Sequence, residues 1–410
     1  MSTKTKIEKK YFSKYKKPLV EFPNLLETQL ASYKWLIEHG LKEVFKEFSP
    51  INDYSEKKFM LEFTSFSLGE PKFDEYYAKA NKLTYDAQLK ARVKLMNKTL
   101  GGSSKEQEIF LADIPLMTDH GTFIINGVER VIVSQLARSF GVFFTDLDLK
   151  GKKLFGAKII PARGVWIEIE SDSDGVLYVR IDKKRKFSIT SLLRVLGFTD
   201  ESMLAAAATD EVRHILKLSI EKDPAKTSDE SFIEIYKRLR DGDLATTENA
   251  KEFINSLFSS ERYDLSPVGR FRFNKRFGKP MTDKDLERRT ISKEDLMVIV
   301  EHIISLNNTP NSKADDIDHL GQRRVRYVGE LLQQKIRVGM TQIKRNIQDR
   351  MSTIDVATAL PINIINQRPL QARIKEFFTT NQLSQFMSQE NVLNEIEHLR
   401  ILSALGPGGL

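Results

Sequence analysis

Three closely spaced carboxylates, Asp315, Asp316 and Asp318, form the strongest candidate for metal chemistry in this sequence. Enzymes of phosphoryl transfer hold Mg²⁺ between carboxylates and phosphate, and such a cluster could supply the carboxylates. An arginine-rich stretch follows at 323–326, and its positive charge opposes a bound cation. Asp318 could equally accept a hydrogen bond from the amine of a nucleic-acid base. We therefore predict no metal here and keep base recognition as the alternative.

Other catalytic patterns are absent from the sequence. It contains no Walker loop, no GxGxxG, no HExxH and no nucleophile elbow, and its six histidines show no metal-binding spacing. The absence of cysteine excludes disulfides and thiolate metal sites. No apolar run approaches the ~18 to 20 residues of a membrane span, and the lysine-rich start lacks the apolar core of a signal peptide. These features predict a cytoplasmic protein without membrane contact.

Length and charge indicate a protein of several domains. A chain of 410 residues exceeds the roughly 250 to 300 residues that one hydrophobic core supports, so we expect two or three domains. The net charge of +8 is modest, and the position of the basic residues therefore matters more than their number. Residues 1–20 form a basic tail with seven lysines and one acid, Glu8. Such a tail favours a solvated arm over a specific nucleic-acid contact.

Two stretches combine polar groups with aromatic rings in a way that suits nucleic acid. The alternation RFRF at 270–273 predicts a strand with arginines on one face and phenylalanines on the other. Cations can contact phosphates while rings anchor the strand, although a solvated basic edge strand fits equally well. Val165, Ile167 and Ile169 place Trp166 on the opposite, polar face of another strand. That tryptophan either covers a neighbouring domain or offers a stacking surface for a base.

The elements that position these residues begin with a mixed helix and strand region. Pro23 precedes a helical pattern that we expect to end at Gly40. Period-two patterns predict strands within 59–85 and 87–95. Asn126-Gly127 between two apolar runs predicts a tight hairpin, and we place a domain boundary near Ala137.

A second region combines strands with helices. Strands are expected within 153–187, joined by a turn at 170–175 that resembles a calcium loop but lacks its bidentate acid, because Ile181 stands at the twelfth position. Helices are predicted over 190–195, 232–239 and 250–258. Apolar spacing over 325–351 then predicts one helix, or a broken pair with Gly329 and Gly339 as weak points, and a short helix follows over 370–378.

The end of the chain combines a polar and aromatic run, QLSQFM at 382–387, an amphipathic turn at 392–398 and a glycine-rich loop at 406–409. Glycines beside a proline allow unusual backbone angles and let another group approach closely. A chain that stops inside such a loop leads us to expect a longer protein.

Several runs resemble the β subunit of bacterial DNA-directed RNA polymerase, in the same order along the chain. They are DIPLMTDH (113–120), GTFIINGVERVIVSQ (121–135), SSERYDLSPVG (259–269), DDIDHLGQRRVRYVG (315–329), QLSQFM (382–387) and SALGPGGL (403–410). The resemblance implies an α+β fold with two mixed arms, the lobe being inserted into the protrusion, plus the beginning of the fork. It divides the chain into a tail (1–20), protrusion (21–137 and 327–376), lobe (138–326) and start of the fork and rifamycin-pocket region (377–410).

The resemblance also implies a role in DNA-templated RNA synthesis. The catalytic Mg²⁺ would be bound by the partner β′ subunit, so this part alone is expected to be inactive. Its partners would be DNA, nascent RNA, the β′, α and ω subunits and a sigma factor. A stand-alone single-strand-binding or regulatory module is the alternative, and exposed apolar surface at Phe377, Phe378, Phe386 and Leu410 would favour the polymerase subunit.

Two sets of site residues follow from the resemblance. The nucleic-acid contacts would be Arg138, Trp166, Ile317, Asp318, Arg323 and Leu410 around an unpaired guanine, with Arg326 and Arg345 near downstream DNA. The inhibitor pocket would involve Leu383, Gln385, Phe386, Ser388, His398, Ile401, Ser403 and Leu405. Ser388, Leu399 and Ile401 depart from the Asp, Lys and Arg that are usual in the family, which predicts poor rifamycin binding.

Overall fold

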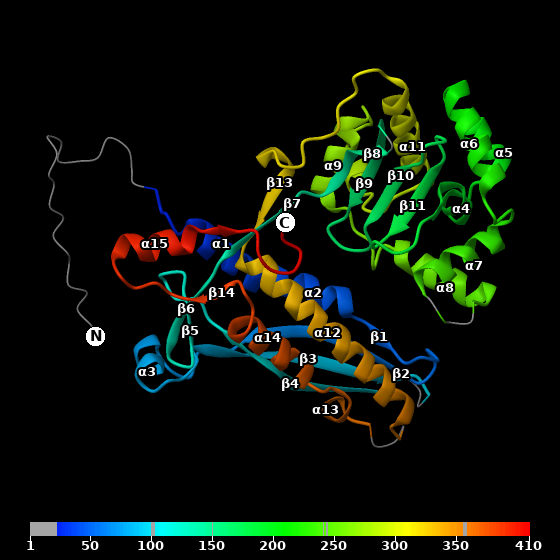
Figure 1. The fold of residues 1–410 in the computed structure, drawn as a ribbon. Coiled ribbons are helices and arrows are strands. Elements are labelled where there is room, and N and C mark those ends of the chain that lie inside the picture. The colour runs from blue at the N-terminus through cyan, green and yellow to red at the C-terminus, as the bar shows by residue number, and fades with distance from the viewer. Residues whose placement is uncertain (1–22, 100–102, 150, 241, 243–244, 356–358) are drawn as a thin grey trace, which may run out of the picture. The chain divides into compact units, whose positions relative to one another are not determined.

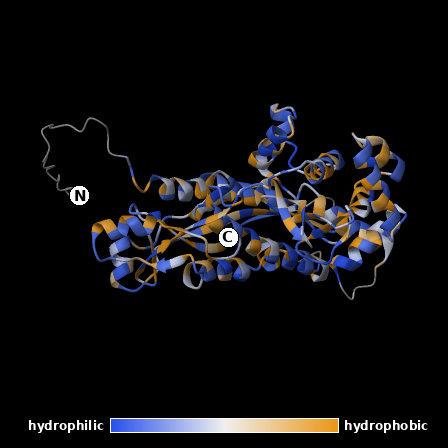
Figure 2. Ribbon diagram, turned by 45° about the horizontal axis from the view of Figure 1, so that its top comes forward, coloured by the Kyte–Doolittle hydropathy of each residue, from blue (hydrophilic) through white to orange (hydrophobic). Residues whose placement is uncertain are grey.

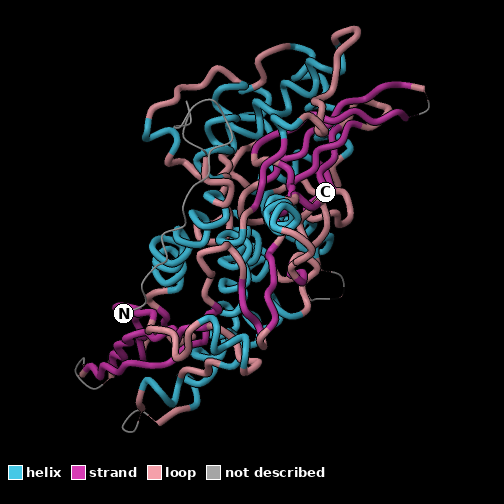
Figure 3. The backbone as a smooth tube through the Cα atoms, turned by 90° about the vertical axis from the view of Figure 1, so that its left-hand side faces the viewer, coloured by secondary structure: helices cyan, strands magenta, loops and turns pink. Residues whose placement is uncertain are grey.

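The structure is a computed structural model that describes residues 23–410 except 100–102, 150, 241, 243–244 and 356–358. The predicted basic tail, residues 1–20, lies outside the described residues. The chain forms two compact units, which we call unit 1 (Met1–Ala137 and Val325–Leu410) and unit 2 (Arg138–Arg324). Both mix helices with small sheets (Figures 1 and 3), which confirms the α+β class. No helix in the described part of the chain is long and apolar enough to cross a membrane.

Unit 1 is built on a four-stranded antiparallel sheet in the order β1-β2-β3-β4. Its strands are β1 (Ile51–Asn52), β2 (Phe59–Leu68), β3 (Asp86–Asn97) and β4 (Ser104–Pro115). Along β3, Leu89, Ala91 and Val93 are buried, while Arg92 on the other face is exposed. The predicted alternation is therefore confirmed, and the mixture of polar and apolar positions is visible along the strands in Figure 2.

Helices of unit 1 come from both ends of the chain. They are α1 (Glu27–Trp35), the π-helical η1 (Leu36–Gly40), α2 (Leu41–Phe48), α3 (Glu75–Ala80), α12 (Val328–Thr353), α13 (Pro361–Ile364), α14 (Arg368–Thr379) and α15 (Val392–Arg400). Helix α12 packs against α1, α2 and α14, and α14 packs against β4. The buried apolar side chains of α1, η1, α2, α12, α13, α14 and the sheet form one core, whereas Leu399 of α15 packs with Val131 and Val133 in a separate small cluster.

The expected helix end at Gly40 is wrong. The chain passes from α1 through η1 into α2, and Gly40 has helical backbone angles with φ −60°. A Cβ atom at Gly40 would lie 3.1 to 3.3 Å from Leu36, Trp35 and Gln333, and the Gly40 carbonyl accepts a hydrogen bond from Gln333 Nε2 at 2.9 Å. The glycine thus serves close packing against α12, because a Cβ atom there would require these side chains to shift by a few tenths of an ångström.

Close packing also explains the glycines of α12, which is one unbroken helix. A Cβ atom at Gly329 would lie 2.2 Å from the Ser32 carbonyl oxygen. A Cβ atom at Gly339 would lie 3.0 Å from the Leu370 Cα atom. Glycine lowers intrinsic helix propensity by about 1 kcal/mol, but here it lets α1 and α14 approach the backbone of α12. The single-helix alternative is therefore confirmed.

The predicted hairpin is present as β5 (Phe123–Ile125) and β6 (Val128–Ile132). Asn126 and Gly127 both have positive φ, 52° and 79°, as a type I′ turn requires. Strand β6 also pairs with β14 (Ser384–Phe386). A third small sheet has the order β13-β7-β15, with β13 (Arg323–Arg326), β7 (Ser134–Arg138) and β15 (Leu402–Ser403). Segments far apart in the sequence are thereby joined.

Unit 2 contains a five-stranded antiparallel sheet and a helical layer. The strands are β8 (Gly141–Leu149), β9 (Lys152–Ile160), β10 (Ile167–Ser171), β11 (Leu177–Ile181) and β12 (Phe187–Ser188). The helices are α4 (Ile189–Val195), α5 (Asp200–Ala206), α6 (Asp210–Lys222), α7 (Ser228–Leu239), α8 (Thr247–Phe258), α9 (Ser266–Arg276), α10 (Asp283–Leu286), α11 (Lys293–Asn308) and the 3₁₀ helix η2 (Leu320–Gln322). The three predicted helices correspond to α4, α7 and α8, and the turn at 170–175 joins β10 to β11 as expected.

The strand predicted at 270–273 is wrong, because these residues lie within α9. Pro267 stands in the first turn of the helix, where its fixed φ is favourable, and four alternating residues were too few to specify a strand. Arg270 is buried and pairs with Asp295 at 2.8 Å. Burial alone would raise the pKa of Asp295, but Lys279 and Arg270 hold it below its usual value. Arg270 is therefore a structural residue and not a phosphate contact.

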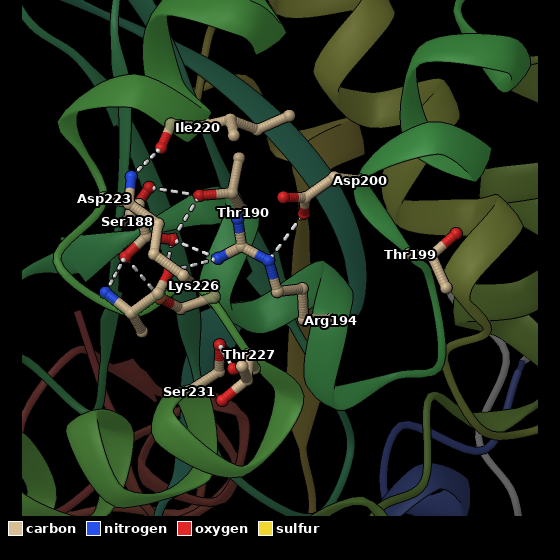
Figure 4. Close-up of polar contacts among 12 residues, drawn as sticks. Ser188, Thr190, Arg194, Thr199, Asp200, Ile220, Asp223, Lys226, Thr227 and Ser231 are labelled. Atoms are coloured by element: carbon tan, nitrogen blue, oxygen red, sulfur yellow. Dashed lines mark hydrogen bonds and ion pairs between the residues drawn. The ribbon is translucent and has the colours of Figure 1, made fainter.

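A second buried ion-pair network fixes the helical layer of unit 2 (Figure 4). Arg194 lies between Asp200, at 2.6 Å, and Asp223, at 2.8 Å. Asp223 also accepts hydrogen bonds from Thr190 and Ser191. Asp223, which directly follows α6, thus anchors the helices of unit 2 to one another. A buried carboxylate needs such partners because its desolvation is costly.

Candidate nucleic-acid-binding site

The loop that carries the acidic cluster is fixed to unit 2 by one of its members. We call residues 311–322 the Asp315 loop. The Asp315 carboxylate forms a bidentate pair with the Arg276 guanidinium, at 2.7 and 3.0 Å, and accepts the Phe144 N–H at 2.7 Å. The Asp315 N–H donates in turn to the Phe144 carbonyl at 2.9 Å. Because both the backbone and the side chain of Asp315 are bonded to β8, this residue anchors the loop.

Aromatic groups complete the anchor. The Arg276 guanidinium lies 4.5 Å from the centroid of the Phe144 ring, and the His302 ring meets Phe144 edge-on at a centroid distance of 4.5 Å. Burial and the nearby Arg276 lower the pKa of His302 below its usual value. A neutral imidazole here avoids repulsion with the guanidinium, so the anchor contains a single cation and a single anion.

Asp318 lies beyond the anchor and is exposed. Its carboxylate accepts a hydrogen bond from Arg323 at 2.5 Å, while its own N–H donates to the Asp316 side chain at 2.9 Å. The Asp318 side chain keeps 79% of its surface accessible, so it can still accept a hydrogen bond from a base. With two of the three carboxylates paired to arginines, the cluster does not fit a magnesium site.

Two further predicted contacts are Arg138, which lies next to this loop, and Ile317, which lies within it. The N–H of Ser139, which follows Arg138, donates to the carbonyl of Gln322 at 2.9 Å. Ile317 lines a cavity of about 330 Å³ together with residues of β8, β9 and β10. The structure therefore brings Asp318, Arg323 and the backbone beside Arg138 to one end of the loop and places Ile317 over the sheet.

Trp166 precedes β10 and does not belong to a strand. Its N–H donates to Asp182 Oδ1 at 2.9 Å, and its carbonyl accepts the Asp182 N–H at 3.0 Å. The residue is half-buried. The polar face predicted for this strand is an ion-pair face, because Glu168 is paired with Lys158 at 3.3 Å. Among the described residues, no hydrogen bond or ion pair joins the Trp166 side chain to the Asp315 loop.

Three of the predicted nucleic-acid contacts belong to unit 1. Arg326 donates to Gln135 and to the Gly408 carbonyl and pairs with Glu330. Arg345 is exposed on α12, and Leu410 is 45% exposed. The Arg345 side chain is thus exposed to solvent, whereas Arg326 is bonded to other residues of unit 1.

The C-terminal segment, residues 380–410, is held against unit 1 by backbone pairing. Strand β14 pairs with β6, and β15 runs parallel to β7. Gln135 Nε2 donates to the carbonyls of Leu405, at 2.9 Å, and Pro407, at 3.2 Å. Gly406 and Gly408 have φ of +90° and +79°, and a Cβ atom at Gly408 would lie 2.6 Å from the Arg326 guanidinium. The close approach predicted for these glycines is confirmed.

A neutral histidine network organises the centre of the C-terminal segment. His398 is buried, and burial lowers its pKa. Its Nδ1 accepts the Ser388 N–H at 3.2 Å, so Nε2 carries the proton and donates to Gln385 Oε1 at 3.1 Å. The Ser388 hydroxyl accepts from Asn394 at 2.8 Å. This network links β14 to α15 through the uncharged side chains of Gln385, Ser388, Asn394 and His398, and Asn394 also donates to Glu390 at 3.5 Å.

Apolar side chains of this segment divide into buried and exposed groups. The expected exposure of Phe377 and Phe378 is wrong, because each is only 1% exposed and packs in the core of unit 1 with Phe123. Phe386, at 62%, and Leu410, at 45%, are exposed as predicted. The Arg130 guanidinium lies 4.4 Å from the centroid of the Phe386 ring. The other side chains of the expected pocket are buried at Leu383, half-buried at Ser403 and exposed at Ile401 and Leu405.

Comparison with known proteins decides the family. Residues 139–326 match the family model described as RNA polymerase Rpb2, domain 2. The chain is 46% identical over 402 residues to the "DNA-directed RNA polymerase subunit beta" of Syntrophomonas wolfei, covering 97% of this chain and 35% of that protein. It is 43% identical over 438 residues to the subunit of the same name from Chloroflexus aggregans, covering 99% and 36%. The chain belongs to the family of bacterial RNA polymerase β subunits. It spans about a third of the length of these curated relatives.

Sequence patterns alone did not identify several residues that hold functional segments of this RNA polymerase β chain in position. Arg276 lies outside the run at 270–273 discussed above, and its partner Asp315 lies 39 residues away in the chain. Gln29 is buried and donates to Ser134 Oγ and to the Leu399 carbonyl, which joins α1 to the C-terminal segment. No local pattern marks such long-range pairs.

Proposed function

We propose that the chain forms part of the DNA cleft of a bacterial RNA polymerase and contacts the opened strands. The observation that carries this proposal is the identity of 46% to a β subunit across 97% of the chain. DNA-templated RNA synthesis would be the activity of the assembled enzyme. By the resemblance, the catalytic Mg²⁺ would be bound outside this chain, by β′. The pairing of Asp315 and Asp318 with arginines is compatible with this.

We further propose that units 1 and 2 correspond to the protrusion and the lobe, with the C-terminal segment as the start of the fork. The partners would be the β′, α and ω subunits, a sigma factor, DNA and nascent RNA. Exposed Phe386 and Leu410 support an arm that meets other parts of a larger assembly. In this setting the chain works by holding strands in place.

A base-recognition role is proposed for Arg138, Trp166, Ile317, Asp318, Arg323 and Leu410. The accessible Asp318 carboxylate can accept from the donor edge of an unpaired guanine, whereas thymine offers only one donor at N3. Trp166 adds a face on which a base can stack, worth about 1 to 3 kcal/mol. Arg326 and Arg345 would face downstream DNA, where cations contact phosphates without reading sequence.

The test uses polymerase assembled with a β subunit that contains this chain. Binding of promoter templates with guanine or thymine at the downstream edge of the non-template strand is compared for the unaltered enzyme, Trp166→Ala and Asp318→Asn. We expect a guanine preference in the unaltered enzyme and its loss in both variants. Equal affinity for guanine and thymine in the unaltered enzyme would refute base recognition. A chain that fails to assemble with β′ would instead favour the stand-alone module.

We also propose that the inhibitor pocket of the family lies around β14 and α15. Leu383, Gln385, Phe386, Ser388, His398, Ile401, Ser403 and Leu405 all lie on the C-terminal segment, and the His398 network connects three of them. This network is uncharged. An inhibitor that depends on a carboxylate or a guanidinium at these positions would find neither.

A further inference from the structure

Four consecutive basic side chains lie in the turn that joins β11 to β12. Lys183, Lys184, Arg185 and Lys186 are all exposed, and Asp182 is the single acid of the turn. We call residues 182–186 the basic turn. The turn is tight, because the Lys184 N–H donates to the Ile181 carbonyl at 3.0 Å. Its four cations are therefore held close together on a defined backbone.

The backbone of the basic turn is strained. Asp182 and Lys183 both have positive φ, 48° and 61°, as the central residues of a type I′ turn. Asn-Gly is the preferred pair for this turn, and the same chain uses it at Asn126-Gly127. A lysine in the left-handed region is disfavoured because its Cβ crowds the backbone. Selection for folding alone would have favoured glycine at position 183, which points to a use for the lysine.

Two lysines at the centre of the basic turn, Lys183 and Lys184, lack an acidic partner in the described part of the chain. Lys186 lies 4.5 Å from the centroid of the Tyr178 ring. On neighbouring β10, Glu168 pairs with Lys158 and Glu170 with Arg180, so neither is free to compensate the turn. Clustered like charges repel one another, and a polyanion would remove that repulsion.

The basic turn is joined directly to Trp166. Two hydrogen bonds connect the Trp166 backbone to Asp182, so the first lysine of the turn follows the residue that holds the tryptophan. An aromatic side chain and a row of cations on one rigid support match a polymer with alternating bases and phosphates. Such a surface binds a single strand without reading its sequence.

We propose that the basic turn is a binding site for the phosphate backbone of single-stranded DNA, adjacent to the base contact at Trp166. The inference rests on the proposed function and adds a sequence-independent contact to it. Lys183, Lys184 and Lys186 would each contact a phosphate and release a counterion. The strained turn would keep these ammonium groups beside the stacked base, so that little order has to be gained on binding.

The binding test uses the 410-residue chain and a fluorescein-labelled oligothymidylate of about fifteen nucleotides, with salt between about 0.05 and 0.4 M. Thymine separates this contact from guanine recognition. For Lys183→Ala/Lys184→Ala/Lys186→Ala we expect the slope of log affinity against log salt to fall by about 2, since each contact on a single strand contributes about 0.7. The affinity at about 0.1 M salt should fall tenfold or more. The control Lys217→Ala/Lys237→Ala/Lys284→Ala removes three other exposed lysines of unit 2 and should leave the slope unchanged.

A second variant separates binding from folding. Asp182→Asn with Lys183→Gly supplies the preferred turn sequence and keeps an oxygen that can accept the Trp166 N–H. We expect this variant to melt about 2 to 4 °C higher and yet to bind the oligonucleotide severalfold more weakly. A lower melting temperature together with unchanged binding would overturn the inference.

The remaining outcomes are also decisive. If the unaltered chain binds DNA and the triple lysine variant keeps the same salt slope, the inference fails while the proposed function stands. If the unaltered chain binds no DNA, both fail. If polyglutamate competes as well as the oligothymidylate, the basic turn is a general anion site, and the assignment to single-stranded DNA is overturned.

Discussion

At the scale of single residues, chemical identity decides what the His398 network can bind. The resemblance implies an acid and an arginine at the positions of Ser388 and Ile401, and a lysine at that of Leu399, which is 3% exposed. The neutral His398 accepts from a backbone N–H and donates to a glutamine. Loss of both members of an ion pair leaves no uncompensated buried charge, so the fold tolerates it.

The rifamycin prediction follows from this neutral network. Polymerase assembled with a β subunit of this sequence should transcribe normally and be inhibited weakly by rifampicin. Ser388→Asp/Ile401→Arg should restore inhibition by tenfold or more, because charge-assisted hydrogen bonds contribute about 1.5 to 3 kcal/mol. Each single variant serves as a control and should restore less, since it introduces an unpaired charge. Half-inhibition of the unaltered enzyme at nanomolar rifampicin in a transcription assay would contradict the prediction.

Asp86 is a second residue with a local consequence. Burial and the nearby Asp113 raise its pKa to about 6. Its folded pKa lies above the unfolded value, so the folded state binds the proton more tightly. The stability that protonation provides is complete below about pH 4 and is lost as the pH rises toward about 6.

Asp86→Asn should therefore stabilise unit 1 at pH 7 and remove this pH dependence. Because the carboxylate is only half-buried, solvent screening reduces the expected gain to about 1 kcal/mol. Urea unfolding between pH 4 and pH 8 measures the effect. Glu70→Gln, which removes an exposed acid in the loop between β2 and α3, is the charge-matched control. Parallel stability curves for the Asp86 variant and the unaltered chain would show that Asp86 titrates normally.

At the scale of elements, Asp315 determines where its loop lies. The bidentate Arg276 pair and the two bonds to Phe144 leave Ile317 and Asp318 only two and three residues from a fixed point. We call Asp315 and Arg276 positioning residues, because the proposed contact with the base belongs to Asp318. A lysine in place of Arg276 would keep the charge but not the two parallel hydrogen bonds.

The prediction for this anchor distinguishes loss of the fixed position of the Asp315 loop from loss of a charged side chain. Asp315→Ala and Arg276→Lys should both raise amide hydrogen exchange across 311–319 and weaken guanine preference. Arg276→Lys should affect exchange less, since one ion-pair contact survives. Lys275→Ala, which removes the exposed neighbouring cation on α9, should change neither quantity. A loss of guanine preference without faster exchange would mean that Asp315 contacts the base itself.

The helices, strands and turns that could be predicted from the sequence are those that local residue patterns determine. The β3 alternation and the Asn126-Gly127 turn were recognised because period-two burial and positive φ leave direct marks in the residue types. The strand prediction at 270–273 failed because the alternation did not reflect burial: Arg270 is buried with a partner, Asp295, that lies 25 residues away. The helix end predicted at Gly40 failed for a similar reason, since the glycine packs against Gln333, which comes from a helix distant in the sequence. The resemblance named site residues on loops, strands and helices, such as Asp318, Arg323 and Arg345. It did not name the residues that anchor them, because long-range pairs have no local period.

At the scale of the whole molecule, two separate cores determine how the chain unfolds. One core contains Ile347 and Phe377, and its members all belong to unit 1. The other contains Ile299 and Ile169, and its members all belong to unit 2. Unit 1 is assembled from two stretches of chain on either side of unit 2, so it can fold only after residues beyond Arg324 are available. Unit 2 is continuous and has no such requirement.

The two cores predict two calorimetric transitions that respond to different substitutions. Ile347→Ala should lower only the transition of unit 1, and Ile299→Ala only that of unit 2, because both side chains are fully buried and each truncation costs about 2 to 5 kcal/mol. Shifts of roughly 4 to 10 °C are expected for units of this size. Val338→Ala and Val268→Ala, which shorten exposed side chains in the two units, should shift neither transition by more than about 1 °C. A single transition that moves equally with either core substitution would mean that the cores unfold as one cooperative system.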